Sequence, residues 1–173
     1  MKKRREPLLW IGIGFLVLLV LFAIFGPSIR HPYIGSVGSP HLGPSTQFWL
    51  GTDELGQDIF ARLAFGARIS LKIGLTVLMI SLSIGVSVGV LGVFAPNWVR
   101  LPLLRFTDGM FAFPDILLAV LIVGMLKPGE FPVIVALSVT SWPSIARLVV
   151  TQVASLKDRE YVVAARAMGA STF

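Results

Sequence analysis

The chain lacks cysteine and carries little charge. None of its 173 residues is Cys, and 14% are Asp, Glu, Lys or Arg, whereas a soluble domain typically carries about a quarter. The absence of cysteine excludes disulfides, thiolate metal sites and cysteine nucleophiles. Because 55% of the residues are hydrophobic and many lie in long runs, the composition predicts an all-α polytopic membrane protein.

Catalytic and ligand-binding motifs are also missing. No G-x-x-x-x-G-K-[S/T] sequence occurs, which excludes nucleotide binding through a P-loop. No Ser/His/Asp set or pair of carboxylates stands at a credible buried position, so we expect no enzymatic activity and no cofactor bound by this chain. The two histidines, His31 and His41, lie in a Pro- and Gly-rich loop without a carboxylate at ligand spacing, so no metal site is predicted.

Apolar runs predict about four membrane-spanning helices. The first run, Leu8 to Gly26, covers a hydrocarbon core of roughly 30 Å at about 1.5 Å per residue. It is longer than the apolar core of a signal peptide, so we expect it to be retained. The predicted division is a basic cytoplasmic N-terminus (1–7), a first span (8–26), an extracytoplasmic segment (27–68), a second span (69–95), a cytoplasmic turn (96–109), a third span (110–126), an outer turn (127–130), a fourth span (131–150) and a cytoplasmic segment (151–173).

The formal net charge of +6 is explained by membrane orientation, because the basic residues lie at the ends of the apolar runs. We therefore expect a lipid bilayer and no nucleic acid as the partner of these charges. Ten basic residues fall on the predicted inner side, Lys2, Lys3, Arg4, Arg5, Arg100, Arg105, Arg147, Lys157, Arg159 and Arg166, and five on the outer side, Arg30, Arg62, Arg68, Lys72 and Lys127. This excess predicts a cytoplasmic N-terminus.

Two features inside the predicted spans bear on packing and function. Ser81, Gly85 and Gly89 recur every four residues, a spacing that allows close helix contacts in lipid. Asp115 follows Pro114 near the start of the third span. It is either an interfacial residue in a first helical turn, where the helix dipole favours an anion, or a wall of a translocation path.

The stretch from Phe48 to Leu71 precedes the second span. Residues Asp58 to Gly66 predict a short amphipathic outer helix, in which Asp58 and Arg62 can pair four residues apart.

The last residues, from Ser155 to Phe173, differ from the rest in carrying many charges. Good helix formers predict a helix that is solvated at the membrane surface or docks a partner. Tyr161, Ala164, Ala165 and Met168 share one face of it, and Arg159 and Arg166 lie on another. Gly169 is the predicted stop, because it can adopt a left-handed conformation.

Two motifs resemble a known family. The sequence REYVVAARAMGAS resembles the EAA loop of ABC-importer permeases, and its Glu-Tyr pair resembles the oligopeptide/dipeptide/nickel importer branch. The earlier stretch resembles that family's segment LGTDxxGRDxxSRxxxGxRxSL, with Gln57 and Ala61 as departures. The matching residues are Glu160, Tyr161, Ala164, Ala165 and Gly169 in the first motif, and Leu50, Gly51, Thr52, Asp53, Gly56, Asp58, Arg62, Gly66, Arg68, Ser70 and Leu71 in the second.

The resemblance implies a C-type permease subunit in the cell (inner) membrane. Its implied partners are a second permease subunit, two cytoplasmic ABC ATPase subunits and an extracytoplasmic substrate-binding protein. Glu160, Tyr161, Ala164, Ala165, Arg166 and Gly169 would then dock the ATPase and transmit its closure to the spans.

Several alternatives stay open at this stage. The substrate implied by the family is a peptide or nickel. The family continues past the EAA glycine into two further spans, so we expect a fragment or a truncated product. The alternative function is a non-ABC membrane scaffold or a small channel subunit.

Overall fold

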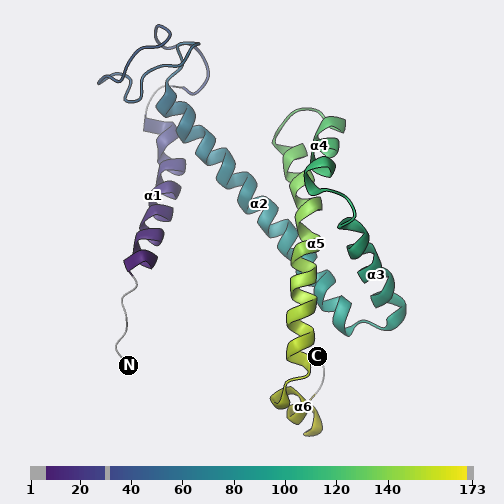
Figure 1. Ribbon diagram of the computed structural model, residues 1–173. Coiled ribbons are helices and arrows are strands. Elements are labelled where there is room, and N and C mark those ends of the chain that lie inside the picture. Colours follow the sequence, from purple (N-terminus) through teal and green to yellow (C-terminus); the bar gives the residue numbers. More distant parts are fainter. Residues whose placement is uncertain (1–6, 30–31, 171–173) are drawn as a thin grey trace. The chain divides into compact units, whose positions relative to one another are not determined.

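The structure is a computed structural model that describes residues 7–29 and 32–170 (Figure 1). The described residues form six α-helices and no named strand, which confirms the all-helical prediction. The chain divides into two compact units, one up to Gly74 and one from Leu75 onward. The helices are α1 (Pro7–Ile29), α2 (Ile59–Phe94), α3 (Asn97–Met110), α4 (Asp115–Met125), α5 (Glu130–Lys157) and α6 (Glu160–Ala167).

Three helices, α1, α2 and α5, are long and apolar enough to cross a membrane. A fourth crossing is formed if α3 and α4, which meet at a bend of 87°, count as one broken span. The prediction of a polytopic membrane protein is therefore confirmed. The predicted basic N-terminus, residues Lys2 to Arg5, lies outside the described residues.

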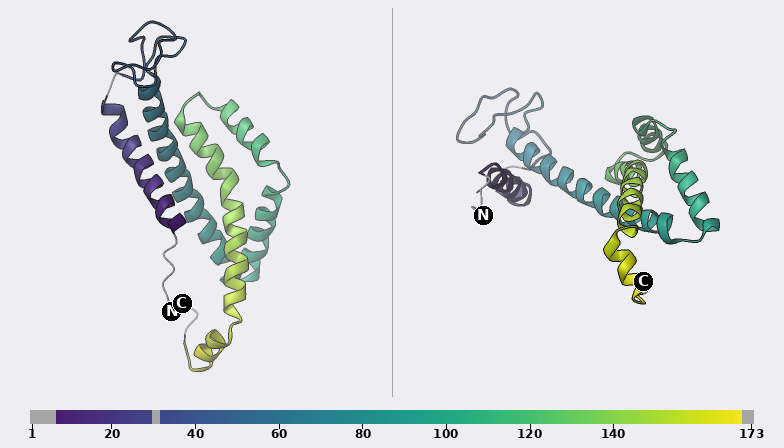
Figure 2. Two further views of the ribbon diagram at one scale, coloured as in Figure 1. Left: turned by 60° about the vertical axis from the view of Figure 1, so that its left-hand side comes forward. Right: turned by 60° about the horizontal axis from the view of Figure 1, so that its bottom comes forward.

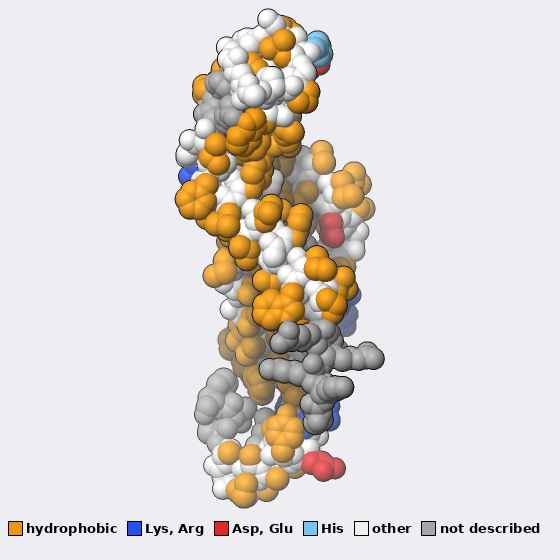
Figure 3. All heavy atoms as spheres, turned by 90° about the vertical axis from the view of Figure 1, so that its left-hand side faces the viewer, with side chains coloured by type: hydrophobic (Ala, Val, Ile, Leu, Met, Phe, Trp, Pro, Cys, Tyr) orange, Lys and Arg blue, Asp and Glu red, His pale blue; other side chains and the backbone are white. Residues whose placement is uncertain are grey.

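The first unit is built around the contact between α1 and the start of α2. Most side chains of α1 are exposed and hydrophobic, as suits a lipid-facing helix (Figure 3). The two helices approach closely where Gly26 meets Ala64, since a Cβ at Gly26 would lie 2.7 Å from the Ala64 Cβ. Next to this contact, the rings of Phe22 and Phe60 meet edge to face at 5.4 Å.

The predicted outer helix, Asp58 to Gly66, is not a separate element. It is the beginning of α2, which continues without a break to Phe94. No proline occurs in this stretch, and a single glycine such as Gly66 costs a helix only about 1 kcal/mol relative to Ala. At about 1.5 Å per residue, α2 is roughly 54 Å long, so it extends well beyond a hydrocarbon core of roughly 30 Å.

In the second unit, α2 packs against α5 through the predicted small-residue stripe. A Cβ at Gly85 would lie 2.7 Å from Ile145, and one at Gly89 would lie 2.5 Å from Val149. The Ser81 hydroxyl, which is 1% exposed, donates to the Ser138 carbonyl at 3.4 Å. The predicted close approach is confirmed, because only small residues fit between these backbones.

The structure has helix where a turn was predicted at residues 96–109, and the helix in the predicted third span at 110–126 is shorter. Residues 97–110 form α3, which begins after Pro96, and only 115–125 continue as α4. Pro114 causes the break, because proline disfavours the helical conformation of the preceding Phe113. Figures 1 and 2 show α3 and α4 beside successive parts of α5, and both helices contact it.

Helix α5 begins at Glu130 and extends to Lys157, seven residues past the predicted end of the fourth span. Pro143 lies inside it and is buried next to Trp142. The Trp142 ring stacks on Phe106 of α3, with ring centroids 6.0 Å apart. This aromatic pair fixes the middle of α3 against α5.

Candidate functional site

The candidate docking segment is α6, which follows α5 after a two-residue connection. Asp158 caps the end of α5, and the Arg159 N–H donates to the Leu156 carbonyl at 3.2 Å. Glu160 then lies in the first turn of α6, where a carboxylate is favoured by the helix dipole. The short connection makes α6 a direct continuation of the longest helix in the second unit.

The end of α6 confirms the predicted glycine stop. Gly169 has φ +93°, a left-handed conformation that side chains with a Cβ rarely adopt. The Ala170 N–H donates to the Ala165 carbonyl at 3.0 Å, and the Met168 N–H to the Ala164 carbonyl at 3.1 Å. The first of these bonds closes a Schellman motif, so the helix has a defined end rather than a frayed one.

One predicted face of α6 is largely exposed. Tyr161 and Met168 are 64% and 84% exposed, and Ala164 is exposed beside them. Ala165 is half-buried. Arg166 occupies a position in the helix, but its side chain lies outside the described part of the structure. The segment therefore presents a mixed apolar and small-residue surface to a partner.

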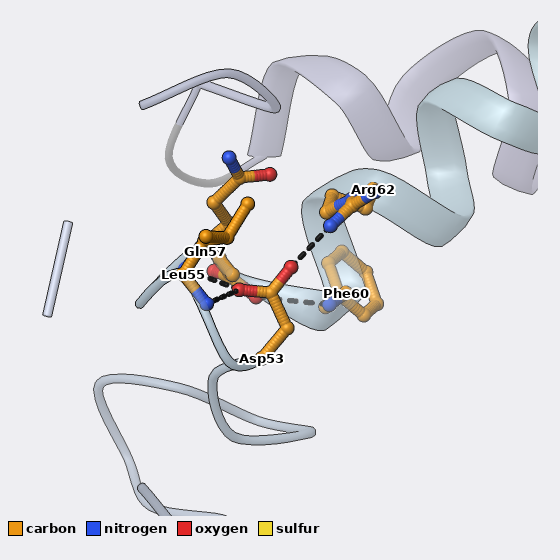
Figure 4. Close-up of polar contacts among 6 residues, drawn as sticks. Asp53, Leu55, Gln57, Phe60 and Arg62 are labelled. Carbon is orange, nitrogen blue, oxygen red and sulfur yellow. Dashed lines mark hydrogen bonds and ion pairs between the residues drawn. The ribbon is translucent and has the colours of Figure 1, made fainter. Parts of the chain in front are cut away.

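The second sequence motif forms a tightly bonded loop at the start of α2. Asp53 Oδ1 accepts hydrogen bonds from the N–H groups of Leu55 and Gln57, both at 2.9 Å (Figure 4). Asp53 Oδ2 forms an ion pair with the Arg62 guanidinium. The Gln57 and Leu55 N–H donors, together with Arg62, hold the pKa of the Asp53 carboxyl below its usual range.

Thr52 forms hydrogen bonds with loop residues ten or more positions earlier in the sequence. Its Oγ1 donates to the Ser39 carbonyl at 2.6 Å and accepts from the Leu42 N–H at 2.9 Å. Its own N–H donates to the Leu42 carbonyl at 3.0 Å. Because Thr52 is 4% exposed, these bonds satisfy the polar groups that burial takes from water.

Two of the motif glycines occupy positions that exclude other residues. Gly51 and Gly56 have φ of +78° and +72°, and a Cβ on either would collide with a backbone carbonyl, that of Leu42 or Gly38. Asp58 is fully buried at the start of α2, where its Oδ1 accepts from the Phe60 N–H at 2.9 Å as a helix N-cap.

Sequence reasoning missed the partner of Arg62. We expected it to pair with Asp58 four residues away, and the structure joins it to Asp53, nine residues earlier. The helical spacing gave no sign of this contact, because Asp53 lies before the helix, on a loop. Several motif residues thus have a structural role, since Asp58 caps α2, Asp53 pairs with Arg62, and Gly51 and Gly56 permit turns.

Asp115 begins α4, directly after Pro114, and is exposed. The prediction that Asp115 lies in the first turn of a helix is confirmed. It lies at the bend between α3 and α4, the only such bent pair among residues 7–29 and 32–170.

A second unexpected contact lies beside this bend. Arg147 of α5 donates from Nη2 to Asp108 Oδ1 of α3 at 2.9 Å, and its guanidinium lies 3.8 Å from the ring centroid of Phe111. A cavity of about 220 Å³ adjoins the ion pair. It is lined by Val88, Leu104, Thr107, Asp108, Ala146, Arg147, Val150 and Thr151.

Metal-ligating side chains do not gather in the part of the chain that the structure describes. No group of three or more Asp, Glu, His or Cys residues there could hold a metal ion. His41 lies in the loop before α2, and His31 is outside the described residues.

Two parts of the chain match known families of membrane transport proteins. A family described as "Binding-protein-dependent transport system inner membrane component" matches residues 80–173, and the "N-terminal TM domain of oligopeptide transport permease C" matches residues 4–48. These two matches together cover α6 and most of the helices described above.

Three curated relatives resemble almost the whole chain. An oligopeptide transport system permease protein of Bacillus subtilis is 37% identical over 171 residues, which is 98% of this chain and 56% of the relative. A di/tripeptide transport system permease protein of Pseudomonas aeruginosa is 40% identical, covering 93% of this chain and 56% of the relative. A glutathione transport system permease protein of Escherichia coli is 38% identical, covering 97% and 56%.

The chain spans about half the length of the curated relatives it matches. These relatives are named as transport permease subunits and not as enzymes. The first family match covers more than half of the present sequence, and its description agrees with the membrane-spanning helices. The chain belongs to the family of binding-protein-dependent transport system inner membrane components.

Proposed function

We propose that the chain forms part of the translocation path of an ATP-driven importer and docks a cytoplasmic ATPase through α6. The observation that carries this proposal is the exposed, capped helix α6, joined to α5 by only two residues. A short helix in this position offers a partner a defined surface and a rigid connection to a membrane span. Glu160, Tyr161, Ala164, Ala165, Arg166 and Gly169 would form that docking surface.

The proposed orientation needs an even number of crossings before α6. At about 1.5 Å per residue, α3 and α4 rise about 21 and 17 Å along their axes. If each is tilted by half of the 87° bend, together they cover about 27 Å of the bilayer normal, close to a hydrocarbon core of roughly 30 Å. The bent pair is thus long enough to serve as the third of four crossings.

Charge distribution supports the same orientation. On the division predicted from the sequence, ten Lys and Arg residues lie on the side assigned to the cytoplasm and five on the other. Arg100 and Arg105 of α3 lie within the bent pair, and without them the excess is still eight to five. A basic excess of this kind marks the cytoplasmic side of a membrane protein. The N-terminus and α6 would both be cytoplasmic, where an ATPase could reach α6.

Peptides are the proposed substrate class. Support comes from the relatives named for oligopeptide, di/tripeptide and glutathione transport. A second permease subunit, two ATPase subunits and an extracytoplasmic binding protein would complete the transporter. Energy would come from the ATPases, with no cofactor on this chain, and Asp115 would contribute to the wall of the path.

Docking can be tested by cross-linking, because the natural chain has no cysteine. Ala165→Cys would be expressed with the candidate ATPase subunits, and cross-links would be measured in membranes with and without ATP. We expect a cross-link to the ATPase whose yield changes with ATP. Ala23→Cys is the buried control, since Ala23 is 2% exposed in α1.

A second control, Ser155→Cys, places an exposed thiol on α5 just before the connection to α6. It should cross-link more weakly than Ala165→Cys if α6 itself is the docking surface. Labelling of Ala165→Cys from the cytoplasm without capture of an ATPase would contradict the docking proposal.

A further inference from the structure

One side chain of α5 contacts the corner between α3 and α4 on its α3 side. Arg147 pairs with Asp108 in the last turn of α3, with Nη2 and Oδ1 2.9 Å apart. The same guanidinium lies 3.8 Å from the ring centroid of Phe111, the C-cap residue of α3. The planar guanidinium can form an ion pair and a cation–π contact at the same time, which an ammonium does less well.

The corner itself, residues 111–114, has few bonds of its own that would fix its angle. Its backbone N–H groups bond back into α3, from Phe111 to Asp108 at 3.2 Å and from Phe113 to Met110 at 3.4 Å. Pro114 has no N–H to donate. These bonds end α3 but do not tie it to α4, so side-chain contacts with α5 are needed to set the bend.

Arg147 also lies on a direct mechanical connection to α6. Helix α5 is unbroken from Arg147 to Lys157, a distance of about 15 Å at 1.5 Å per residue. Two residues later α6 begins. A displacement of α6 would therefore move the Arg147 guanidinium, and with it the corner residues that the guanidinium contacts.

The surroundings of the pair allow such movement. The adjoining cavity of about 220 Å³ lies among residues of α2, α3 and α5. Close-packed interiors resist small shifts, whereas a cavity beside a contact leaves the side chains around it less tightly packed. The Arg147 and Asp108 side chains are 53% and 59% exposed, so close packing does not lock the pair in one position.

We propose that Arg147 is a positioning residue that couples α6 to the α3–α4 corner through Asp108 and Phe111. The inference rests on the proposed function of α6 as the ATPase-docking helix. When α6 moves with the ATPase, Arg147 carries the corner along, and Asp115 at the start of α4 moves with it. The contacts of Arg147 with Asp108 and Phe111 serve to link the two helices in motion more than to stabilise the fold.

The test measures the corner and the docking helix separately in the complete transporter, with its ATPases, in lipid. Phe113→Cys, whose parent side chain is 63% exposed, reports on the corner, and Met168→Cys, at 84%, reports on α6. Each single-cysteine protein is labelled with a nitroxide, and the mobility of the label is measured with and without ATP. Arg147→Ala is then introduced into both, with Arg105→Ala, which removes an exposed arginine from α3, as the matched control.

We expect ATP to change the mobility of the label at both cysteines in the parent proteins. In Arg147→Ala, the effect of ATP at Phe113→Cys should fall about five- to tenfold, the size expected for one exposed ion pair and one cation–π contact. The effect at Met168→Cys should persist. Substrate uptake per ATP hydrolysed should fall, while ATP hydrolysis itself continues, and Arg105→Ala should leave all these values unchanged.

Charge exchange provides a further check. The double variant Asp108→Arg with Arg147→Asp restores an ion pair and should recover part of the response at Phe113→Cys. A merely structural role would lower uptake and hydrolysis together. An undiminished response at Phe113→Cys in Arg147→Ala would overturn the coupling while leaving docking intact, whereas no response at Met168→Cys in the parent would overturn docking itself.

Discussion

Asp53 organises the loop before α2 through bonds of two kinds. Its Oδ1 accepts from the N–H groups of Leu55 and Gln57, and its Oδ2 pairs with Arg62 on α2. One carboxylate thus fixes a local turn and ties that turn to a helix. This accounts for an aspartate at this place in the motif, a requirement that spacing alone did not explain.

The lowered pKa of Asp53 predicts a pH dependence of this loop. A carboxyl whose pKa is lower in the folded loop stabilises the loop fully above the unfolded pKa of 3.8, and this stability is lost as the pH falls through the folded pKa. We expect hydrogen-exchange protection of residues 55–57, corrected for intrinsic rates, to be constant from about pH 7 to 5 and to fall below about pH 4.

Asp53→Asn is the matched variant for this measurement. Its side-chain oxygen can still accept from the two N–H groups, but the ion pair with Arg62 is lost. Protection should be lower at neutral pH and should no longer depend on acid in this range. Protection in the parent protein that stays constant down to pH 3 would show that the Asp53 charge does not hold the loop.

Gly56 and Gly66 offer a contrast between two glycines of one motif. Gly56 has φ +72°, and an added Cβ would collide with the Gly38 carbonyl, whereas a Cβ at Gly66 meets nothing within 4 Å inside α2. We expect Gly56→Ala to destabilise the protein by more than about 1 kcal/mol and Gly66→Ala to stabilise it by about 0.5–1 kcal/mol. Thermal unfolding in detergent measures both, and equal melting temperatures would contradict this account.

At the scale of elements, the contact between α2 and α5 depends on glycines. A Cβ at Gly89 would lie 2.5 Å from Val149 and 3.0 Å from the Ala146 carbonyl, so the helices must separate to accept it. We expect Gly89→Ala to cost about 1–3 kcal/mol through overpacking. Gly74→Ala, also in α2 with nothing within 4 Å, should cost nothing. Unfolding of the two variants at the same temperature would show that the approach is looser than described.

The sequence predicted the positions of the helices that are set by hydrophobic runs. It did not predict where several helices begin and end. The first apolar run is α1, and the predicted end of the second span lies one residue from the end of α2 at Phe94. The start of α2 was missed because its first turns are polar enough to suggest a separate helix. Helix α3 was missed because Pro96 and Pro102 suggested a turn, although both are tolerated, Pro96 as the N-cap and Pro102 inside the helix.

At the scale of the whole molecule, local motifs were predictable and long-range contacts were not. Gly169 could be recognised as a helix stop because the left-handed conformation is a property of glycine itself. The bond from Thr52 to Ser39, and the pair of Asp108 with Arg147, join residues 13 and 39 positions apart. No pattern of period 3.6 or 2 indicates such contacts, since they depend on how the elements pack.

The proposed docking requires that α6 face the cytoplasm, across the membrane from the loop before α2. Between Leu55 and Met168 the chain passes through α2, the bent pair and α5. If the bent pair crosses the membrane, the chain crosses three times between Leu55 and Met168, and the two residues lie on opposite sides. If the bent pair is a re-entrant loop, the chain crosses only twice, and the two residues lie on the same side.

The most direct test labels Leu55→Cys and Met168→Cys with a membrane-impermeant maleimide in right-side-out and inside-out vesicles. Both parent side chains are exposed, at 61% and 84%, and the chain has no other cysteine. We expect Leu55→Cys to react only in right-side-out vesicles and Met168→Cys only in inside-out vesicles. Reaction of both from the same side would contradict the fourth crossing and, with it, the docking of a cytoplasmic ATPase on α6.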